Sequence, residues 1–468
     1  MLLTLVSAIL VFLVTTTVFF VATNNAQRQP YMDEVFHVPQ AQQYCAGNFT
    51  AWDPMITTLP GLYLASLPLL YPVAAVFSRG DFRALCTTSM LRSVNILFSL
   101  GNLYVLYIIA HRLHYNRKNA TEMALTALAL ATFPVLYFFT CLYYTDPAAI
   151  FFALVSYSLT LSNKHVPAAV VGAVAILFRQ TNVMWVLFCA GIAKGAVLKK
   201  WLQLEKKDPA EKVYSDWTML SRTFALIGQS LRYNPRQFWN LLMEMFLKVW
   251  SYVLVGVGFV AFVIINKGIV VGDRSNHQPC VNFPQLFYFL FVTVFFSFMH
   301  MISVRQVLSF LKYAVRNPVK TGIFHVVGVV FVYKFMYIHE YNLADNRHYN
   351  FYFLSKLVRR NEYMKYLLIP TYYYAFVTFW SKLQHRDVFW KLAYIICTAA
   401  TLVPQRMLEF RYFIMPYLLF RLNMPMPSKR ALVAEVLFYF LINSLTVYMY
   451  VYKPFPWPNA NSLQRFMW

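Results

Sequence analysis

The chain has 468 residues and a formal net charge of +23, and 59% of its residues are hydrophobic, 18% aromatic and 13% charged. A soluble globular chain carries about 25% charged residues, so no soluble core hides this much apolar surface. The composition excludes a set of soluble domains. It predicts an all-α integral membrane protein, a polytopic helical bundle that forms a single transmembrane domain over 1–468.

The first helix is expected at the apolar run 1–22, which lacks a basic start and a small-residue cleavage site and therefore favours a retained helix over a removed signal peptide. Further apolar runs bring the expected total to about 13 to 14 transmembrane helices. They lie at 91–111, 122–141, 146–162, 166–178, 181–198, 246–266, 284–304, 321–340, 364–382, 388–404, 411–422 and 431–452. A proline-bounded run at 59–78 re-enters the membrane, lies at its surface or forms a split pair of helices.

Basic residues concentrate in every second loop, which predicts a cytosolic location for those loops. They are 112–118, 194–212, 305–320 and 422–430. The opposite side then receives 23–58, 141–146, 178–182, 267–283, 341–362 and 405–411. This alternation explains the net charge without a single basic face, so we expect membrane lipids and no nucleic acid as the anionic partner. The long loop 196–245 is expected to lie along anionic cytosolic headgroups.

The first loop on the opposite side, 23–58, carries Asp33, Glu34, His37 and Asp53 beside the membrane. One of two adjacent carboxylates can serve as a general base, because a neighbouring charge or apolar group raises its pKa toward the working pH. The alternative role is structural. Asp33 directly precedes an apolar-periodic stretch, which is typical of a helix N-cap.

Loop 341–362 places Asp345, Arg347 and His348 among tyrosine and phenylalanine residues. Arginine binds phosphate oxygens through paired N–H groups, and aromatic faces stack on sugar rings. The composition therefore fits a site for a phosphate and a sugar. An aromatic belt at the membrane interface, with basic side chains that reach the headgroups, explains the same pattern.

Two smaller sets of polar residues occur at the ends of apolar runs. Arg179 and Gln180 interrupt apolar sequence, where a charge usually has an anionic partner or ligand. Glu409 and Arg411 lie close together and can bind a ligand or form a structural ion pair. Asp146 has a structural alternative as well, since it can cap the helix that begins at the following proline.

Cysteines and glycosylation sequons provide checks on the assignment of sides. The six cysteines include no CxxC pair, and a disulfide between Cys45 and Cys280 is one possibility because both lie in loops assigned to the same side. The sequons at Asn48 and Asn119 fall on opposite sides, so we expect that only Asn48 can be glycosylated.

Five motifs resemble a known family. They are YMDEVFHVPQAQQYCAGNFTAWDPMITTLPGLYL at 31–64, FRQTN at 178–182, GIVVGDRSNH at 268–277, HEYNLADNRHYNFY at 339–352 and EFRYFIMPY at 409–417. Together they are similar to the dolichyl-phosphate-glucose alpha-1,2-glucosyltransferases of the endoplasmic reticulum. The resemblance implies a multi-pass enzyme of the GT-C type in the endoplasmic reticulum membrane, whose active site faces the lumen and includes the lumenal loops 23–58 and 341–362.

The resemblance also implies the reaction and its partners. Glucose passes from dolichyl phosphate glucose to the terminal glucose of a diglucosylated, dolichol-linked oligosaccharide, with Asp33 or Glu34 as the catalytic base. Conversion of a β-linked phosphate into an α-linkage is an inversion, so a single displacement suffices. The candidate substrate-binding residues are His37, Asp53, Arg179, Gln180, Asp345, Arg347, His348, Glu409 and Arg411.

We expect no cofactor and no metal. The donor already carries an activating lipid phosphate, and the sequence contains neither a GxGxxG loop nor a DxD triplet for a nucleotide-bound metal. A lipid or solute transporter or flippase is the alternative from another class. It predicts repeats and mid-span charges, whereas here the charges gather at the predicted span ends and no repeat is visible.

Overall fold

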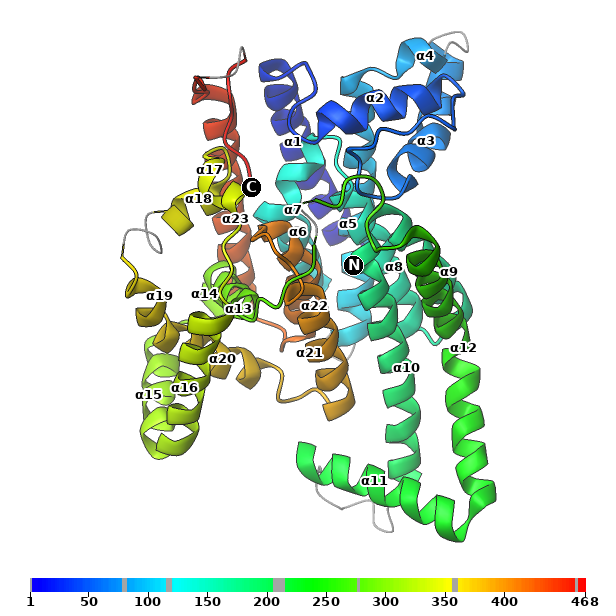
Figure 1. Ribbon diagram of the computed structural model, residues 1–468, viewed down its shortest axis with the longest axis vertical. Coiled ribbons are helices and arrows are strands. Elements are labelled where there is room, and N and C mark those ends of the chain that lie inside the picture. Colours follow the sequence, from blue (N-terminus) through cyan, green and yellow to red (C-terminus); the bar gives the residue numbers. More distant parts are fainter. Residues whose placement is uncertain are drawn as a thin grey trace.

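The computed structural model describes residues 2–77, 82–114, 120–204, 215–275, 278–355, 361–458 and 462–468. Within these ranges the regular elements are helices, and extended segments meet only at two isolated bridges (Figure 1). The all-α prediction is thus confirmed. Asn119 and 205–214, a part of the predicted cytosolic loop, lie outside the described residues.

The bounds of the helices follow the predicted runs closely in most places. In chain order they are α1 (Leu2–Ala26), α2 (Glu34–Cys45), α3 (Gly61–Phe77), α4 (Phe82–Leu85), α5 (Thr88–His114), α6 (Ala120–Ala131), α7 (Pro134–Phe138), η1 (Phe139–Cys141), α8 (Asp146–Leu161), α9 (His165–Phe178), η2 (Gln180–Asn182), α10 (Val183–Leu204), α11 (Asp216–Tyr233), α12 (Pro235–Asn266), α13 (Pro284–Phe296), α14 (Phe298–Met301), α15 (Val304–Arg316), α16 (Pro318–Phe335), α17 (Glu340–Ala344), α18 (Tyr349–Phe353), α19 (Met364–Leu367), α20 (Ile369–Lys382), α21 (Val388–Leu402), η4 (Phe410–Phe413), α22 (Ile414–Asn423) and α23 (Lys429–Tyr452).

Six helices in the described ranges are long and apolar enough to cross a membrane. They are Leu3–Ala26, Thr88–His114, Gln180–Gln203, Pro235–Asn266, Pro318–Phe335 and Lys429–Tyr452. A seventh candidate is bent by 59° between Ala120–Ala131 and Pro134–Cys141. The second piece begins at a proline, which has no backbone N–H to continue the first helix.

Several other predicted spans are shorter helices, so the count of 13 to 14 crossings stays a prediction. α8, α9, α13 and α21 are apolar helices of 10–17 residues. The predicted run 284–304 is divided at Ser297 into α13 and α14. Helices of this length cross a bilayer of full thickness only with flanking segments or local thinning.

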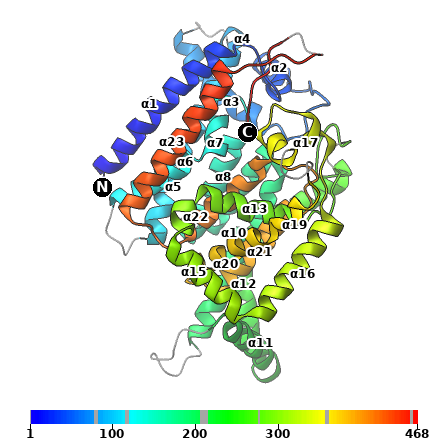
Figure 2. The ribbon, with the colours of Figure 1, turned by 90° about the vertical axis from the view of Figure 1, so that its left-hand side faces the viewer.

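The two ends of the bundle differ in structure. α2, α3, α4 and α17 gather at one end, and α11 runs across the other (Figure 1). α1 and α23 run side by side along the bundle (Figure 2). The central helices, among them α5, α6, α8 and α10, supply much of the buried apolar core. The predicted lumenal loops therefore share one end, where a site can be built from distant parts of the chain.

α15 is a helix within the predicted cytosolic loop 305–320, and its shape fits a position at the membrane surface. Val304, Leu308, Leu311 and Val315 are exposed at spacings of three and four residues, so they form one apolar stripe. Arginine and lysine side chains accompany this stripe along the helix. Such a helix lies in the plane of the interface, with its apolar face toward the acyl chains.

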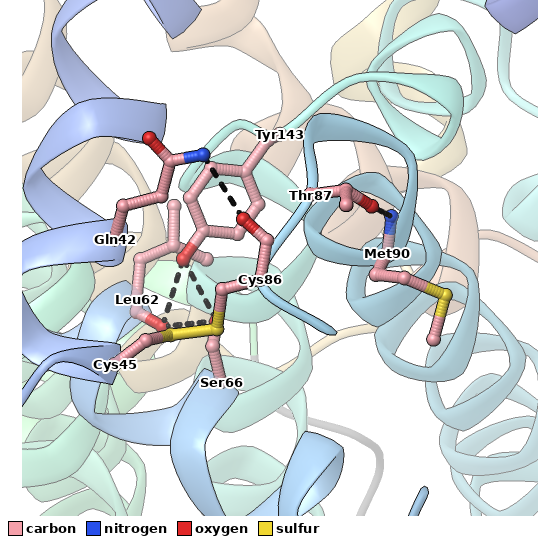
Figure 3. Close-up of a disulfide and its surroundings, with 8 residues drawn as sticks. All are labelled: Gln42, Cys45, Leu62, Ser66, Cys86, Thr87, Met90 and Tyr143. Carbon is pink, nitrogen blue, oxygen red and sulfur yellow. Dashed lines mark hydrogen bonds between the residues drawn. A yellow bond between two sulfur atoms is a disulfide. The ribbon is translucent and has the colours of Figure 1, made fainter. Parts of the chain in front are cut away.

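A disulfide joins Cys45, at the end of α2, to Cys86, just after α4 (Figure 3). The suggested bridge between Cys45 and Cys280 is therefore wrong. The Cα atoms of Cys45 and Cys86 lie 6.6 Å apart. Cys280 is a free cysteine near the Gln405 carbonyl. Spacing in the sequence could not indicate this pairing, because it depends on how α3 returns the chain toward α2.

The disulfide also bears on the run 59–78. Because Cys45 and Cys86 lie on one side of the membrane, the chain between them makes an even number of crossings or none. This run is the single helix α3, which lies with α2 and α4 at the same end of the molecule (Figure 1). The fold therefore agrees with a re-entrant or surface helix rather than a split pair.

The disulfide predicts a thiol count that discriminates between the two pairings. In denatured, unreduced protein a maleimide reagent should label four cysteines, which are Cys141, Cys189, Cys280 and Cys397. In Cys280→Ser the count should fall to three by mass shift on a gel. A rise to five would mean that Cys280 is bridged. Loss of the bridge in Cys45→Ser should cost about 2–4 kcal/mol of stability.

Candidate active site

A cavity of about 390 Å³ lies at the end of the bundle that carries α2 and α17. Its walls come from the start of α2, from 341–350, from 407–411 and from the C-terminal segment. This volume lies in the range of about 300–1,000 Å³ that is typical of small-molecule sites. Six of the predicted site residues line it, namely Asp33, Asp345, Arg347, His348, Glu409 and Arg411.

Arg411 is the centre of the charge cluster in this cavity. Its Nη1 lies 3.3 Å from Asp33 Oδ2 and 3.8 Å from Asp146 Oδ2, and its Nη2 lies 2.8 Å from Glu409 Oε2. The Tyr144 ring lies beside the guanidinium, with its centroid 5.5 Å from Cζ. One cation thus serves three carboxylates, and its side chain is only 14% exposed.

Asp33 occupies the N-cap position of α2, yet among the described residues its carboxylate makes no capping hydrogen bond. The side chain is 46% exposed, and Arg411 is its ion-pair partner. Burial raises the pKa of this carboxyl, but the charges of Arg411, His37 and His348 outweigh burial and hold the pKa below its usual value. The raised pKa expected of a general base is therefore not found at Asp33. The predicted N-cap position is thus correct but the capping role is not, and Asp33 presents a carboxylate to the cavity.

Glu34 is fully buried and its carboxylate is held by Arg92. Arg92 Nε donates to Oε1 at 2.8 Å and Nη2 donates to Oε2 at 2.6 Å. The backbone N–H groups of Tyr31 and Tyr143 donate to the same carboxylate at 3.1 and 2.6 Å. Arg92 also donates to the Gln27 carbonyl, so this one pair joins α5, the end of α1 and the start of α2.

The backbone around Met32 separates the directions of the two acids. Met32 has a φ of 57°, in the left-handed region, which costs a non-glycine residue about 1–2 kcal/mol. The Asp33 N–H donates to the Tyr144 hydroxyl at 3.2 Å. The Tyr31 hydroxyl donates to the Arg465 carbonyl at 2.8 Å. These bonds hold the turn so that Asp33 faces the cavity while Glu34 faces the interior.

Arg347 and Asp345 form a second ion pair in the cavity wall. Arg347 Nε and Nη2 donate to the two Asp345 oxygens at 2.8 and 2.7 Å. Burial raises the Asp345 pKa, but these hydrogen bonds and the charge of His348 outweigh it and lower the pKa. The Trp457 ring covers the Arg347 guanidinium at 4.4 Å.

Two asparagines of the predicted lumenal loop bring the two charged segments together. Asn342 exchanges hydrogen bonds with the Leu408 backbone, at 3.0 Å to its carbonyl and 3.1 Å from its N–H. Asn350 donates to the same carbonyl. Because Leu408 directly precedes Glu409, this contact places Arg411 on the same cavity as Arg347.

Besides Glu34 and Arg179, three predicted site residues lie outside the lining of this cavity. His37 Nδ1 is 2.6 Å from the Tyr63 hydroxyl, and burial lowers the pKa of this imidazole despite the nearby Asp33 charge. Asp53 closes its own turn by accepting a backbone N–H. Gln180 donates to the Thr57 carbonyl at 2.9 Å. His37 thus joins α2 to α3, and Gln180 joins its turn to the loop before α3.

Asp146 is a member of the charge cluster that sequence reasoning did not include. Its carboxylate is 3% exposed and lies 3.2 Å from Arg179 Nη2. Asp146 thus connects Arg179, which is outside the cavity lining, to Arg411. The sequence did show an acidic residue at the end of an apolar run, which could have indicated a site residue. Helix capping explained this position equally well. Trp457 gave no signal, since its segment carried no recognised motif.

The sequence matches a known protein family over most of its length. The model of the DIE2/ALG10 family matches residues 27–422. The chain belongs to the DIE2/ALG10 family. It is 43% identical to the mouse (Mus musculus) protein named Dol-P-Glc:Glc(2)Man(9)GlcNAc(2)-PP-Dol alpha-1,2-glucosyltransferase over 460 residues, which are 96% of this chain and 95% of that protein. A human (Homo sapiens) protein of the same name is 43% identical over 459 residues, with the same coverage.

A more distant DIE2/ALG10 relative has the same name. The Arabidopsis thaliana protein is 33% identical over an alignment of 511 residues, gaps included, that covers 96% of each chain. No solved structure matches the chain. The resemblance seen in the motifs is confirmed, and membership of the DIE2/ALG10 family supports a glucosyltransferase and not the transporter alternative.

In this DIE2/ALG10 protein, breaking the Glu34–Arg92 pair should cost much more stability than removing the Asp33 carboxylate. Arg92→Met should destabilise the fold by about 3–5 kcal/mol, because it leaves the Glu34 carboxylate buried without its cation. Asp33→Asn should change stability by about 1 kcal/mol or less, since its ion pair is partly exposed. Thermal unfolding in detergent measures both. The double variant Arg92→Met with Glu34→Gln should recover part of the loss. An unchanged melting temperature in Arg92→Met would contradict the structural role.

Proposed function

We propose that this protein transfers glucose from dolichyl phosphate glucose to the terminal glucose of a diglucosylated, dolichol-linked oligosaccharide. The names of the relatives support the acceptor and the alpha-1,2 linkage. The observation that carries the proposal is the Asp33 carboxylate beside Arg411 in one cavity. A base and a cation placed this close suit a reaction in which a hydroxyl loses a proton while a phosphate departs.

The proposed reaction is a single displacement with inversion at the donor C1. The acceptor 2-hydroxyl oxygen forms a bond to C1 as the bond from C1 to the phosphate oxygen breaks. Asp33 takes the hydroxyl proton, and dolichyl phosphate leaves with the bonding electrons. We assign the base to Asp33 alone, because both Glu34 oxygens already accept hydrogen bonds from Arg92.

Basic side chains in the cavity are proposed to bind the phosphate. As the donor bond breaks, negative charge grows on the leaving phosphate, so cations that meet it stabilise the transition state more than the ground state. Arg347, His348 and Arg411 line the cavity and are the proposed partners. Arg179 acts indirectly in this scheme, because its guanidinium pairs with Asp146. A reaction without a metal or other cofactor stays a prediction.

We propose that the protein lies in the endoplasmic reticulum membrane with this cavity on the lumenal side. The long apolar helices establish a multi-pass membrane protein. Two observations support the orientation. Basic residues concentrate in the loops at the other side. The Cys45–Cys86 disulfide lies at the cavity end, and disulfides form and persist in oxidising compartments.

Replacement of the base should abolish transfer without unfolding the protein. With purified enzyme, a synthetic dolichyl phosphate glucose and a diglucosylated acceptor, Asp33→Asn should lower kcat by about 10²–10⁴-fold. Asp387→Asn is the matched control, because that carboxylate caps α21 outside the cavity lining and asparagine caps a helix as well, so this variant should keep the wild-type rate. Transfer at the normal rate by Asp33→Asn would remove Asp33 from the reaction. No transfer by the wild type would refute the proposed activity.

The proposed orientation predicts glycosylation of Asn48. This asparagine is exposed in the loop that follows α2, and Thr50 completes its sequon. Removal of N-glycans with an endoglycosidase should increase the gel mobility of the wild type and leave Asn48→Gln unchanged. Asn119→Gln is the control and should behave as the wild type. A glycan on Asn119 would place the cavity on the cytosolic side.

A further inference from the structure

The C-terminal segment that follows α23 returns to the cavity and pairs with its wall. The Met467 N–H donates to the Arg347 carbonyl at 2.9 Å, and the Tyr349 N–H donates to the Met467 carbonyl at 3.2 Å. Phe455 and Gln464 exchange two backbone hydrogen bonds at 2.9 and 2.8 Å. The described parts of this segment, 453–458 and 462–468, therefore lie along the loop that carries Arg347.

Two side chains of this segment fix the Arg347 guanidinium. Gln464 Oε1 accepts from Nη1 at 3.0 Å, and the Trp457 ring lies over the guanidinium at 4.4 Å. Trp457 is itself held, since its Nε1 donates to Asn346 Oδ1 at 2.7 Å. Including the two bonds to Asp345, three of the five guanidinium N–H groups are engaged. The guanidinium is thus oriented from three directions while it still borders the cavity.

The next residue, Arg465, ties the same segment to the other half of the site. Its side chain is buried and donates to the carbonyls of Tyr450 and Ala26, each at 2.6 Å. Its backbone N–H donates to the Tyr31 hydroxyl at 2.8 Å, and Tyr31 lies two residues before Asp33. Adjacent residues, Gln464 and Arg465, therefore contact the Arg347 side and the Asp33 side of the cavity.

We infer that Trp457 and Gln464 are positioning residues, which hold the Arg347 guanidinium in the orientation that binds the donor phosphate. The inference rests on the proposed function. An arginine that is free to rotate has to lose that freedom when phosphate binds, whereas a guanidinium already fixed by a ring and an amide loses less. The stacked indole also covers a face of the guanidinium, which leaves its edge for the in-plane hydrogen bonds that phosphate prefers.

The test measures initial rates of glucose transfer against donor and acceptor concentration in the full-length protein. Trp457→Ala and Gln464→Ala should each raise the donor KM about tenfold, as expected for loss of contacts to a charged group. The acceptor KM should stay within twofold. Trp457→Phe retains a ring and should recover most of the donor affinity. Leu463→Ala, at an exposed position of the same segment, is the matched control and should equal the wild type.

A double-mutant cycle shows whether Trp457 acts through Arg347. Arg347→Gln should raise the donor KM at least as much as Trp457→Ala. The double variant should then be no worse than Arg347→Gln alone, because the stacked ring has no guanidinium left to orient. Additive losses, an unchanged donor KM in both alanine variants or an equal rise in both KM values would overturn the inference.

Binding of a radiolabelled short-chain dolichyl phosphate separates this inference from the proposed function. If the wild type binds this probe and Trp457→Ala binds it about tenfold more weakly, the positioning role holds even where no transfer is seen. If the wild type transfers glucose but the alanine variants bind the probe normally, the positioning role fails and the activity stands. A wild type that neither binds nor transfers refutes both.

Discussion

The buried pair of Glu34 and Arg92 is the interaction on which the site depends. It lies where the end of α1, the start of α2 and α5 meet, and the Tyr143 N–H joins the chain before α8 to it. Such a pair contributes little net stability, because desolvation cancels most of its attraction. Its effect is on geometry, since breaking either partner leaves a buried charge. The turn that carries Asp33 is therefore held in one place.

A few buried hydrogen bonds from side chains to backbone groups hold the segments around the cavity in one arrangement. Asn342 and Asn350 bind the Leu408 backbone, and Arg465 binds the end of α1 and the end of α23. Each contact satisfies backbone groups that would otherwise be buried without partners, which costs about 1–3 kcal/mol each. The irregular backbone around Leu408 is thus held in one position, because side-chain amides supply hydrogen bonds that no helix or strand provides there.

The sequence predicted what is local and missed what depends on distant contacts. Hydropathy located most of the helices, since each apolar run reports its own environment, and charge patterns selected the six acidic and basic residues among those that line the cavity. The choice between Asp33 and Glu34 needed Arg92, which is distant in the sequence. The disulfide partner of Cys45 and the role of Trp457 likewise depend on how the chain returns, and no periodicity encodes that return.

In the proposed reaction, Arg411 can stabilise first the base and then the leaving phosphate. Before reaction, Arg411 is divided among three carboxylates, and Asp33 is one of them. When Asp33 accepts the acceptor proton it becomes neutral and its hold on Arg411 weakens. At the same moment the leaving phosphate gains negative charge. The cation can then shift its interaction from the base to the phosphate without any net change in the charge of the site. A lysine in place of Arg411 would offer one point charge and could not serve both partners with directed N–H groups.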